Sequence, residues 1–330
     1  MTIVRRVAFL LIGLMIVFAF LGINLTRPFI GFNQETFVDI PKGTSIRQMA
    51  ELLQNAGVIR HAWTFYLARL THRGVTLKAG EYRFNQSASV LEVYDRIARG
   101  DVFYYELVVP EGKNMFDIAA AAERLDVFSA ERFLAVARDP SMIRDLDPQA
   151  PSLEGYLFPD TYHLSRGATP ESLCQMMTGK FREVWSSLHA DASVHRTVTL
   201  ASLVEKEGKL ADERPIIASV FTRRLEIRMK LDCDPTTIYA AVLDGSYNGT
   251  IHKSDLASDS PYNTYQHAGL PPGPIANPGK ASLAAALHPA DTNYLYFVAR
   301  ADGSGGHNFS RDLATQDANV AKYRKAIAKR

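Results

Sequence analysis

Two glutamates in one short segment, Glu205 and Glu207 in the run TLASLVEKEG (199–208), are the side chains best suited to chemistry. The run predicts a helix, because its apolar residues recur at spacings of three and four. At about 100° per residue, Glu207 falls on the apolar stripe, while Glu205 projects beside Ala201 and Ser202. The two carboxylates then point roughly 160° apart, so only one of them can face any given cleft.

Either glutamate fits a general acid, which needs a carboxyl pKa near neutral pH. Partial burial beside the apolar stripe would raise that pKa. Small neighbours leave room for a ligand against Glu205, whereas Glu207 lies on the stripe itself. The helical pattern does not choose between them, and it also permits a solvated Glu-Lys-Glu face with no catalytic role.

The motifs of several enzyme classes are absent from the sequence. It contains no Gly-x-Ser-x-Gly, no His-Glu-x-x-His, no phosphate-binding glycine loop and no dinucleotide fingerprint. Nine histidines are scattered without the spacing of metal ligands, so we expect neither a metal nor a cofactor. A net charge of +2 gives no basic surface for nucleic acid.

Glycan cleavage is compatible with a single acid. Ordinary glycosidases need two carboxylates. A lytic transglycosylase needs one, because the C6 hydroxyl of the muramyl sugar serves as the nucleophile. The region 244–279 is too long for a simple connection and is rich in Gly, Pro, Asn and Tyr. We expect it to form a substrate groove through Tyr262, Asn263 and Tyr265, with Asn277 either binding substrate or capping a helix.

The first residues predict a membrane anchor. Residues 7–25 carry no charge and are about as long as a bilayer core is thick. Arg5 and Arg6 precede them, so residues 1–6 are expected in the cytoplasm and everything after the span on the outer side. Residues 26–36 are then a linker. Cys174 and Cys233 are far apart in sequence, and we expect both to be free.

A repeat follows the linker. VDIPKG (38–43) and LVVPEG (107–112) share one pattern, and each leads into two helical segments. AGEYRF (79–84) and FPDTYHL (158–164) each precede a further helix. This order of strand, helix, helix and strand predicts LysM-like α+β modules over residues 37–150; two packing units without a ligand explain it equally well. Residues 151–330 are expected to form a mixed α/β catalytic domain, which makes the whole chain α+β.

The chain resembles the MltG (YceG-like) family of endolytic murein transglycosylases. The resemblance rests on a series of short motifs in the family's order, from near the anchor almost to the last residue: LASLVEKE (200–207), LEGYLFPDTY (153–162), DPT (234–236), YNTY (262–265), GLPPG (269–273), ANPG (276–279), HPA (288–290), YLYFV (294–298) and GGH (305–307). It implies that Glu205 is the acid, with Glu207 beside it in the substrate site. It also implies cleavage of the MurNAc–GlcNAc bond of new strands, 1,6-anhydro ends, and a partnership with peptidoglycan synthases at the bacterial inner membrane.

Two alternatives remain open beside this resemblance. The chain could be a peptidoglycan-binding scaffold without catalysis, or a hydrolytic muramidase that uses Asp232, Asp234 or Glu207 as its second carboxylate. The sequence also departs from the family pattern. Asp232 and Cys233 stand before Asp234, where a Gln and a small polar residue are expected.

Overall fold

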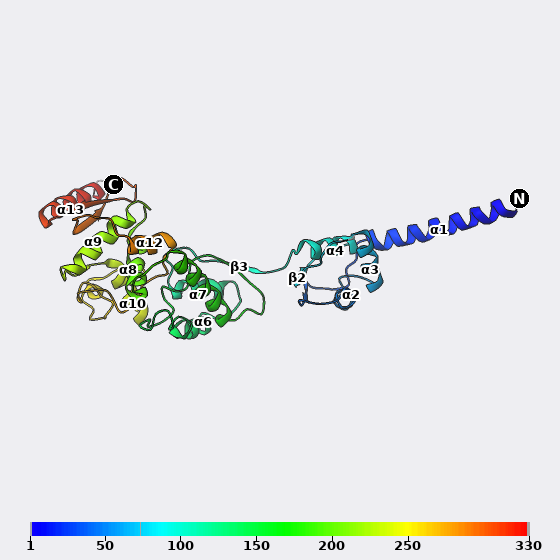
Figure 1. Ribbon diagram of the computed structural model, residues 1–330, viewed down its shortest axis with the longest axis horizontal. Coiled ribbons are helices and arrows are strands. Elements are labelled where there is room, and N and C mark those ends of the chain that lie inside the picture. The colour runs from blue at the N-terminus through cyan, green and yellow to red at the C-terminus, as the bar shows by residue number, and fades with distance from the viewer. Residues whose placement is uncertain (1, 73, 329–330) are drawn as a thin grey trace. The chain divides into compact units, whose positions relative to one another are not determined.

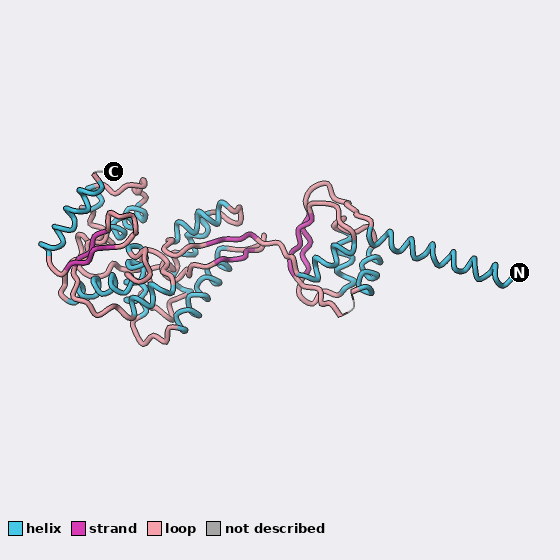
Figure 2. Tube along the Cα trace, turned by 90° about the horizontal axis from the view of Figure 1, so that it is seen from above, coloured by secondary structure: helices cyan, strands magenta, loops and turns pink. Residues whose placement is uncertain are grey.

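The computed structural model describes residues 2–72 and 74–328 (Figure 1). The chain divides into two compact units, Met1–Tyr105 and Glu106–Arg330, called here the N-terminal and the C-terminal unit. Helices and short antiparallel ribbons make up both units, as expected for the α+β class (Figure 2).

The N-terminal unit begins with the apolar helix α1 (Thr2–Thr26). Its segment Ile3–Thr26 is long and apolar enough to cross a membrane, and it fits a single-pass anchor. The expected linker 26–36 is attached to the rest of this unit. The backbones of Phe29 and Ala88 exchange hydrogen bonds of 3.0 and 3.2 Å, and Gly31 N donates to Gly57 O at 2.9 Å.

The first repeat copy completes this unit as predicted. Strand β1 (Thr36–Ile40) pairs antiparallel with β2 (Gly80–Phe84), and Val38 lies opposite Tyr82. Between them lie α2 (Ile46–Asn55) and α3 (Ala62–Thr71), and α4 (Val90–Arg99) follows. Capping boxes start α2 and α4, since Ser45 pairs with Gln48 and Ser89 with Glu92. The alternate inward residues of the strands and the inner faces of the helices form the core: Ile40, Leu53, Phe65, Tyr82 and Ile97.

The second repeat copy has the same order of elements but belongs to the C-terminal unit. It comprises β3 (Tyr105–Val108), α5 (Met115–Arg124), α6 (Ala130–Ala137), the 3₁₀ turn η1 (Pro140–Met142), β4 (Thr161–Leu164) and α7 (Pro170–Ser187). Equivalent turns join strand to helix in both copies. Gly43 and Gly112 have φ of +84° and +76°, and Thr44 N and Lys113 N donate to Pro41 O and Pro110 O. The two compact units divide between residues 105 and 106. A LysM-like region over residues 37–150 and a catalytic domain over 151–330 stay predictions.

The remaining elements surround the predicted catalytic helix α8 (Val194–Glu207). They are α9 (Arg214–Glu226), α10 (Asp234–Asp244), α11 (Lys253–Leu256), α12 (Lys280–Leu287), the antiparallel pair β5 (Tyr296–Ala299) and β6 (His307–Ser310), and α13 (Leu313–Ile327). The apolar stripe of α8, with Leu200, Leu203 and Val204, packs against Ile217 and Phe221 of α9. This packing fixes the rotation of α8 and so decides where its two glutamates point.

Candidate active site

Glu205 is held by two donors. Arg214 Nη2 donates to its Oε1 at 3.1 Å, and Gly279 N donates to its Oε2 at 3.0 Å. Its side chain is only 5% exposed. The carboxylate of Glu205 is therefore committed to contacts within the chain on both oxygens.

The second repeat copy encloses this side of α8. Glu111 in its turn lies 3.5 Å from the same Arg214 guanidinium. Gly279 has no room for a Cβ, which would collide with the Glu111 carboxylate. Gly112 N donates to Asn277 O at 2.9 Å, and Lys206 Nζ donates to Gly112 O at 3.3 Å. Glu205 thus helps to bind the repeat turn to the loop that precedes α12.

Glu207 is in a different environment, on the opposite side of α8. Cys233 Sγ lies 3.4 Å from its Oε1, and no hydrogen bond from the described part of the chain reaches its Oε2. Burial raises the pKa of the Glu207 carboxyl, and the nearby charge of Asp234 acts in the same direction. The Cys233 hydrogen bond, His307 and Lys206 oppose that rise. This carboxyl is therefore biased toward the protonated form and has one oxygen available to a ligand.

A pocket of about 280 Å³ opens beside Glu207. Charged and hydrogen-bonding side chains line much of it: Arg224, Asp232, Cys233, Asp234, Tyr265 and His307. Tyr265 donates its hydroxyl to Asp234 Oδ1 at 2.6 Å, and burial together with that carboxylate raises the pKa of the Tyr265 phenol. Such a wall offers the hydroxyl, carboxylate and ring contacts that a sugar needs.

Both departures from the family pattern lie on this pocket. Asp232 Oδ2 is 3.5 Å from Arg224 Nη1, and burial raises the pKa of the Asp232 carboxyl. Arg224 is itself fixed by donation to the backbone oxygens of Leu295 and Leu231. Cys233 is a buried free thiol, as is Cys174. Burial raises the pKa of the Cys233 thiol, so it stays protonated and can donate to Glu207.

Of the predicted groove residues, only Tyr265 lines the pocket. Tyr262 is half-buried, and its ring centroid lies 5.1 Å from that of Tyr239, which it meets at a tilt. Burial raises the pKa of the Tyr262 hydroxyl to about 12. Asn263 is fully buried, and its Nδ2 donates to three carbonyl oxygens of α11 and the residues just after it, the shortest contact being 2.7 Å to Ser258 O. The geometry favours loop-stabilising roles for Tyr262 and Asn263 over direct contact with substrate.

Asn277 is also fully buried, and all of its polar atoms are used. Its Oδ1 accepts from Gly155 N at 2.8 Å and Leu157 N at 2.9 Å, while its Nδ2 donates to Lys113 O and Glu154 Oε1. Helix α12 starts instead at Gly279, without a side-chain cap. Asn277 is therefore neither a helix cap nor open to substrate. It joins the second repeat copy to the loop that precedes α12.

Sequence reasoning missed a carboxylate–histidine pair next to the pocket, of which His307 lines the pocket wall. Glu213, at the start of α9, accepts from His307 Nδ1 at 2.8 Å and from His307 N at 3.0 Å. Gly306 packs so closely on Glu213 that a Cβ there would come within 2.9 Å of its Oε1. The Gly-Gly-His motif was the available signal, because two small residues before a histidine indicate a close approach of the backbone.

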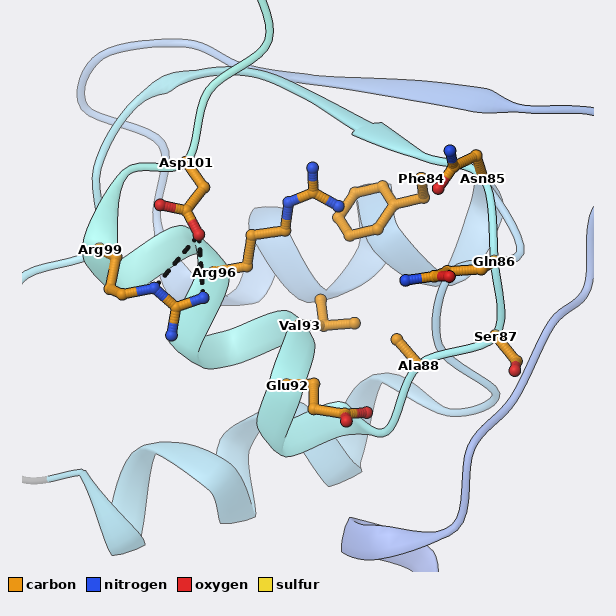
Figure 3. Close-up of a pocket in the computed structure, with 10 residues that line it drawn as sticks. All are labelled: Phe84, Asn85, Gln86, Ser87, Ala88, Glu92, Val93, Arg96, Arg99 and Asp101. Atoms are coloured by element: carbon orange, nitrogen blue, oxygen red, sulfur yellow. Dashed lines mark hydrogen bonds and ion pairs between the residues drawn. The ribbon is translucent and has the colours of Figure 1, made fainter.

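A larger hollow of about 400 Å³ lies in the N-terminal unit (Figure 3). Arg96 stacks over the Phe84 ring at 5.2 Å, and Arg99 pairs with Asp101 at 2.9 Å. These charged groups are already partnered, and the hollow contains no residue of the catalytic helix. That the LysM-like region binds glycan stays a prediction.

Comparisons with known proteins identify the family of the chain. The model of the YceG-like family matches residues 38–322. A Bacillus subtilis protein named endolytic murein transglycosylase is 35% identical over an alignment of 290 residues, and the match covers 81% of this chain and 79% of the relative. A Streptococcus pneumoniae (strain D39) protein of the same name is 29% identical over 322 residues; the match covers 87% of this chain but 58% of that longer relative. The crystal structure of a yceG-like protein from Listeria monocytogenes superimposes with a TM-score of 0.55 at 31% identity, over 86% of this chain and 99% of that one. The chain belongs to the YceG-like family.

Proposed function

We propose that this protein is an endolytic peptidoglycan lytic transglycosylase that cleaves the MurNAc–GlcNAc bond of nascent glycan strands and so ends their elongation. Its place in the YceG-like family supports the reaction class. The observation that carries the assignment in this chain is Glu207: a carboxyl with a raised pKa beside a polar pocket, with one oxygen that accepts no hydrogen bond from the described residues.

The reaction needs one acid that later acts as a base. Protonated Glu207 gives its proton to the oxygen that leaves with GlcNAc as the bond to the muramyl C1 breaks. The C6 hydroxyl oxygen of the same muramyl sugar attacks C1, and its proton goes to the Glu207 carboxylate. The product ends in 1,6-anhydro-MurNAc, water is not consumed, and Glu207 returns to its protonated state.

We assign the proton to Glu207 rather than to Glu205, although the family resemblance implied Glu205. Arg214 and Gly279 N are both donors, so contacts within the chain already occupy both oxygens of Glu205. A general acid must arrive protonated, and burial favours the protonated form of Glu207 by raising its pKa. In this proposal Glu205 positions the loop around Gly279.

A hydrolytic muramidase is the second candidate, because Asp232 and Asp234 line the same pocket as Glu207. Either aspartate could activate a water as the second carboxylate. The hydrogen bond from Tyr265 and the Arg224 ion pair already engage these groups, which favours structural roles for both aspartates.

The test digests polymeric glycan strands and identifies the new ends by mass spectrometry. Native protein is expected to yield anhydro ends, and Glu207→Gln to lose about 10²–10⁴-fold in rate. Glu205→Gln is the matched control, with cleavage retained. Loss of cleavage in Glu205→Gln alone, with both variants folded, refutes the assignment. Reducing ends would indicate the muramidase, and no cleavage by native protein would indicate a scaffold.

The anchor sets the proposed location. With Arg5 and Arg6 before the span, the N-terminus lies in the cytoplasm and both folded units lie on the outer face of the bacterial inner membrane. This location brings the active site close to peptidoglycan synthases, which we propose as partners. A reporter fused to either end, active on only one side of the membrane, tests the orientation.

A further inference from the structure

We propose that helix α3 and the arginines around the end of α1 form a lipid-binding surface, which rests on the membrane and takes the phosphate of an anionic phospholipid. The proposal rests on the anchor described above. It adds a peripheral contact by a folded part of the N-terminal unit.

An apolar stripe on α3 remains exposed, although the Trp63 ring stacks on those of His61 and Phe20. Trp63, Tyr66 and Leu70 follow one another at spacings of three and four, and they are 36%, 37% and 61% exposed. The opposite face of the same helix, with Phe65 and Ala68, is fully buried in the core. An exposed apolar patch of this kind marks a protein or membrane contact, and Trp and Tyr are enriched where a protein meets the membrane interface.

Contact with α1 fixes the level of this stripe relative to the bilayer. The ring of Trp63 stacks on that of Phe20, with centroids 6.3 Å apart and planes within 13°. Phe20 lies in the span Ile3–Thr26, about 9 Å before its end at 1.5 Å per residue. If α1 crosses the membrane, Trp63 must therefore lie at the depth of the headgroups or just below, where Trp and Tyr are enriched.

Arginine side chains lie near the same end of α1. A pocket of about 230 Å³ at the end of α1 is lined by Phe20, Arg27, Phe29 and Arg60 among others, and by no carboxylate. Arg60 stacks over the Phe29 ring at 4.9 Å. Neither Arg27 nor Arg60 forms an ion pair with any residue between 2 and 72 or 74 and 328. Two unneutralised guanidinium groups beside a membrane span attract an anionic headgroup, and a planar guanidinium matches the oxygens of a phosphate.

The two tryptophans of the chain make the contact measurable. Trp63 is half-exposed in the N-terminal unit, whereas Trp185 is 8% exposed in the C-terminal unit. Full-length Trp185→Phe is reconstituted into vesicles of phosphatidylcholine and phosphatidylglycerol, with bromine near either the glycerol end or the methyl end of the acyl chains. We expect the shallow bromine to remove most of the Trp63 emission and the deep bromine to remove less. Trp63→Phe, which reports Trp185, is the matched control and should lose little emission with either lipid.

Two results would overturn the proposal in distinguishable ways. Protein that fails to float with the vesicles refutes the anchor, and the surface with it. Protein that floats while aqueous acrylamide, and not brominated lipid, quenches Trp63 refutes the surface alone and leaves the anchor and the catalytic proposal intact.

A second comparison tests the anionic headgroup. With bromine in the same shallow position, brominated phosphatidylglycerol should quench Trp63 more than brominated phosphatidylcholine. Arg27→Gln combined with Arg60→Gln should abolish that difference, whereas Arg47→Gln, an 80% exposed arginine outside this pocket, should keep it. Equal quenching by the two lipids in the native protein, or a difference that survives in the double variant, refutes the phosphate site.

Discussion

Asn277→Ala should be among the most destabilising substitutions in the C-terminal unit that alter no apolar side chain. The asparagine side chain accepts from two buried backbone N–H groups, those of Gly155 and Leu157, and donates to Lys113 O and Glu154. Alanine leaves both N–H groups without an acceptor, at about 1–3 kcal/mol each. With partial relaxation we expect a total loss of about 3–5 kcal/mol, which lowers Tm by about 10 °C in a unit of this size.

Thermal unfolding of the full chain in detergent, followed by near-ultraviolet circular dichroism, measures this loss. Asn308→Ala is the control, because Asn308 is exposed and its side chain forms no hydrogen bond with the described residues. Asn277→Asp separates packing from hydrogen bonding. It keeps the acceptor for the two N–H groups but replaces the donor with an oxygen facing Lys113 O and Glu154. The unfolding free energy that Asn277→Asp loses should therefore grow as pH rises. If the Tm of Asn277→Ala lies within about 2 °C of that of the Asn308→Ala control, then this amide does not hold the second repeat copy to the loop that precedes α12.

Three further predictions concern ionisable groups. Cys233→Ala removes the donor to Glu207 Oε1, so the pKa of Glu207 should rise and the alkaline limb of the kcat/KM profile should move to higher pH; an unmoved limb contradicts this role for the thiol. Arg214→Gln leaves Glu205 and Glu111 facing each other without the cation that they share. We expect urea unfolding to show about 2–4 kcal/mol of destabilisation. Adding Glu111→Gln should restore part of that stability. Burial raises the pKa of the Glu154 carboxyl from 4.5 to about 8 in the folded chain. The stability that protonated Glu154 contributes is therefore complete below pH 4.5 and is lost as pH rises through about 8. Glu154→Gln should flatten the decline of the unfolding free energy across that pH window.

Local sequence features predicted much of the fold. The turns at Gly43 and Gly112, the Ser and Thr caps and the three-to-four spacing of apolar residues specify the elements of both repeat copies. The resemblance to a family added the order of the catalytic elements. Local features do not give contacts between distant parts of the chain, such as the hydrogen bond from Gly155 N to Asn277 Oδ1, which joins residues 122 positions apart.

The choice between the two glutamates illustrates the same limit. A helical wheel separates Glu205 from Glu207 but does not say which side of the helix receives Arg214, Gly279 and the repeat turn. The composition of the region 244–279 likewise suggested Tyr262, Asn263 and Asn277 as groove residues, although buried amides are equally suited to fixing a loop. Only the three-dimensional contacts distinguish a polar side chain that is already satisfied from one that remains available.

The two turns of the repeat have different surroundings. In the first copy the charged turn residue is Lys42, and the module has a core of its own. In the second copy Glu111 and Gly112 are built into the surroundings of the catalytic helix. The second copy is therefore part of the catalytic half of the chain, and a module exchange that replaced it would also remove the contacts of Glu111 and Gly112 around α8.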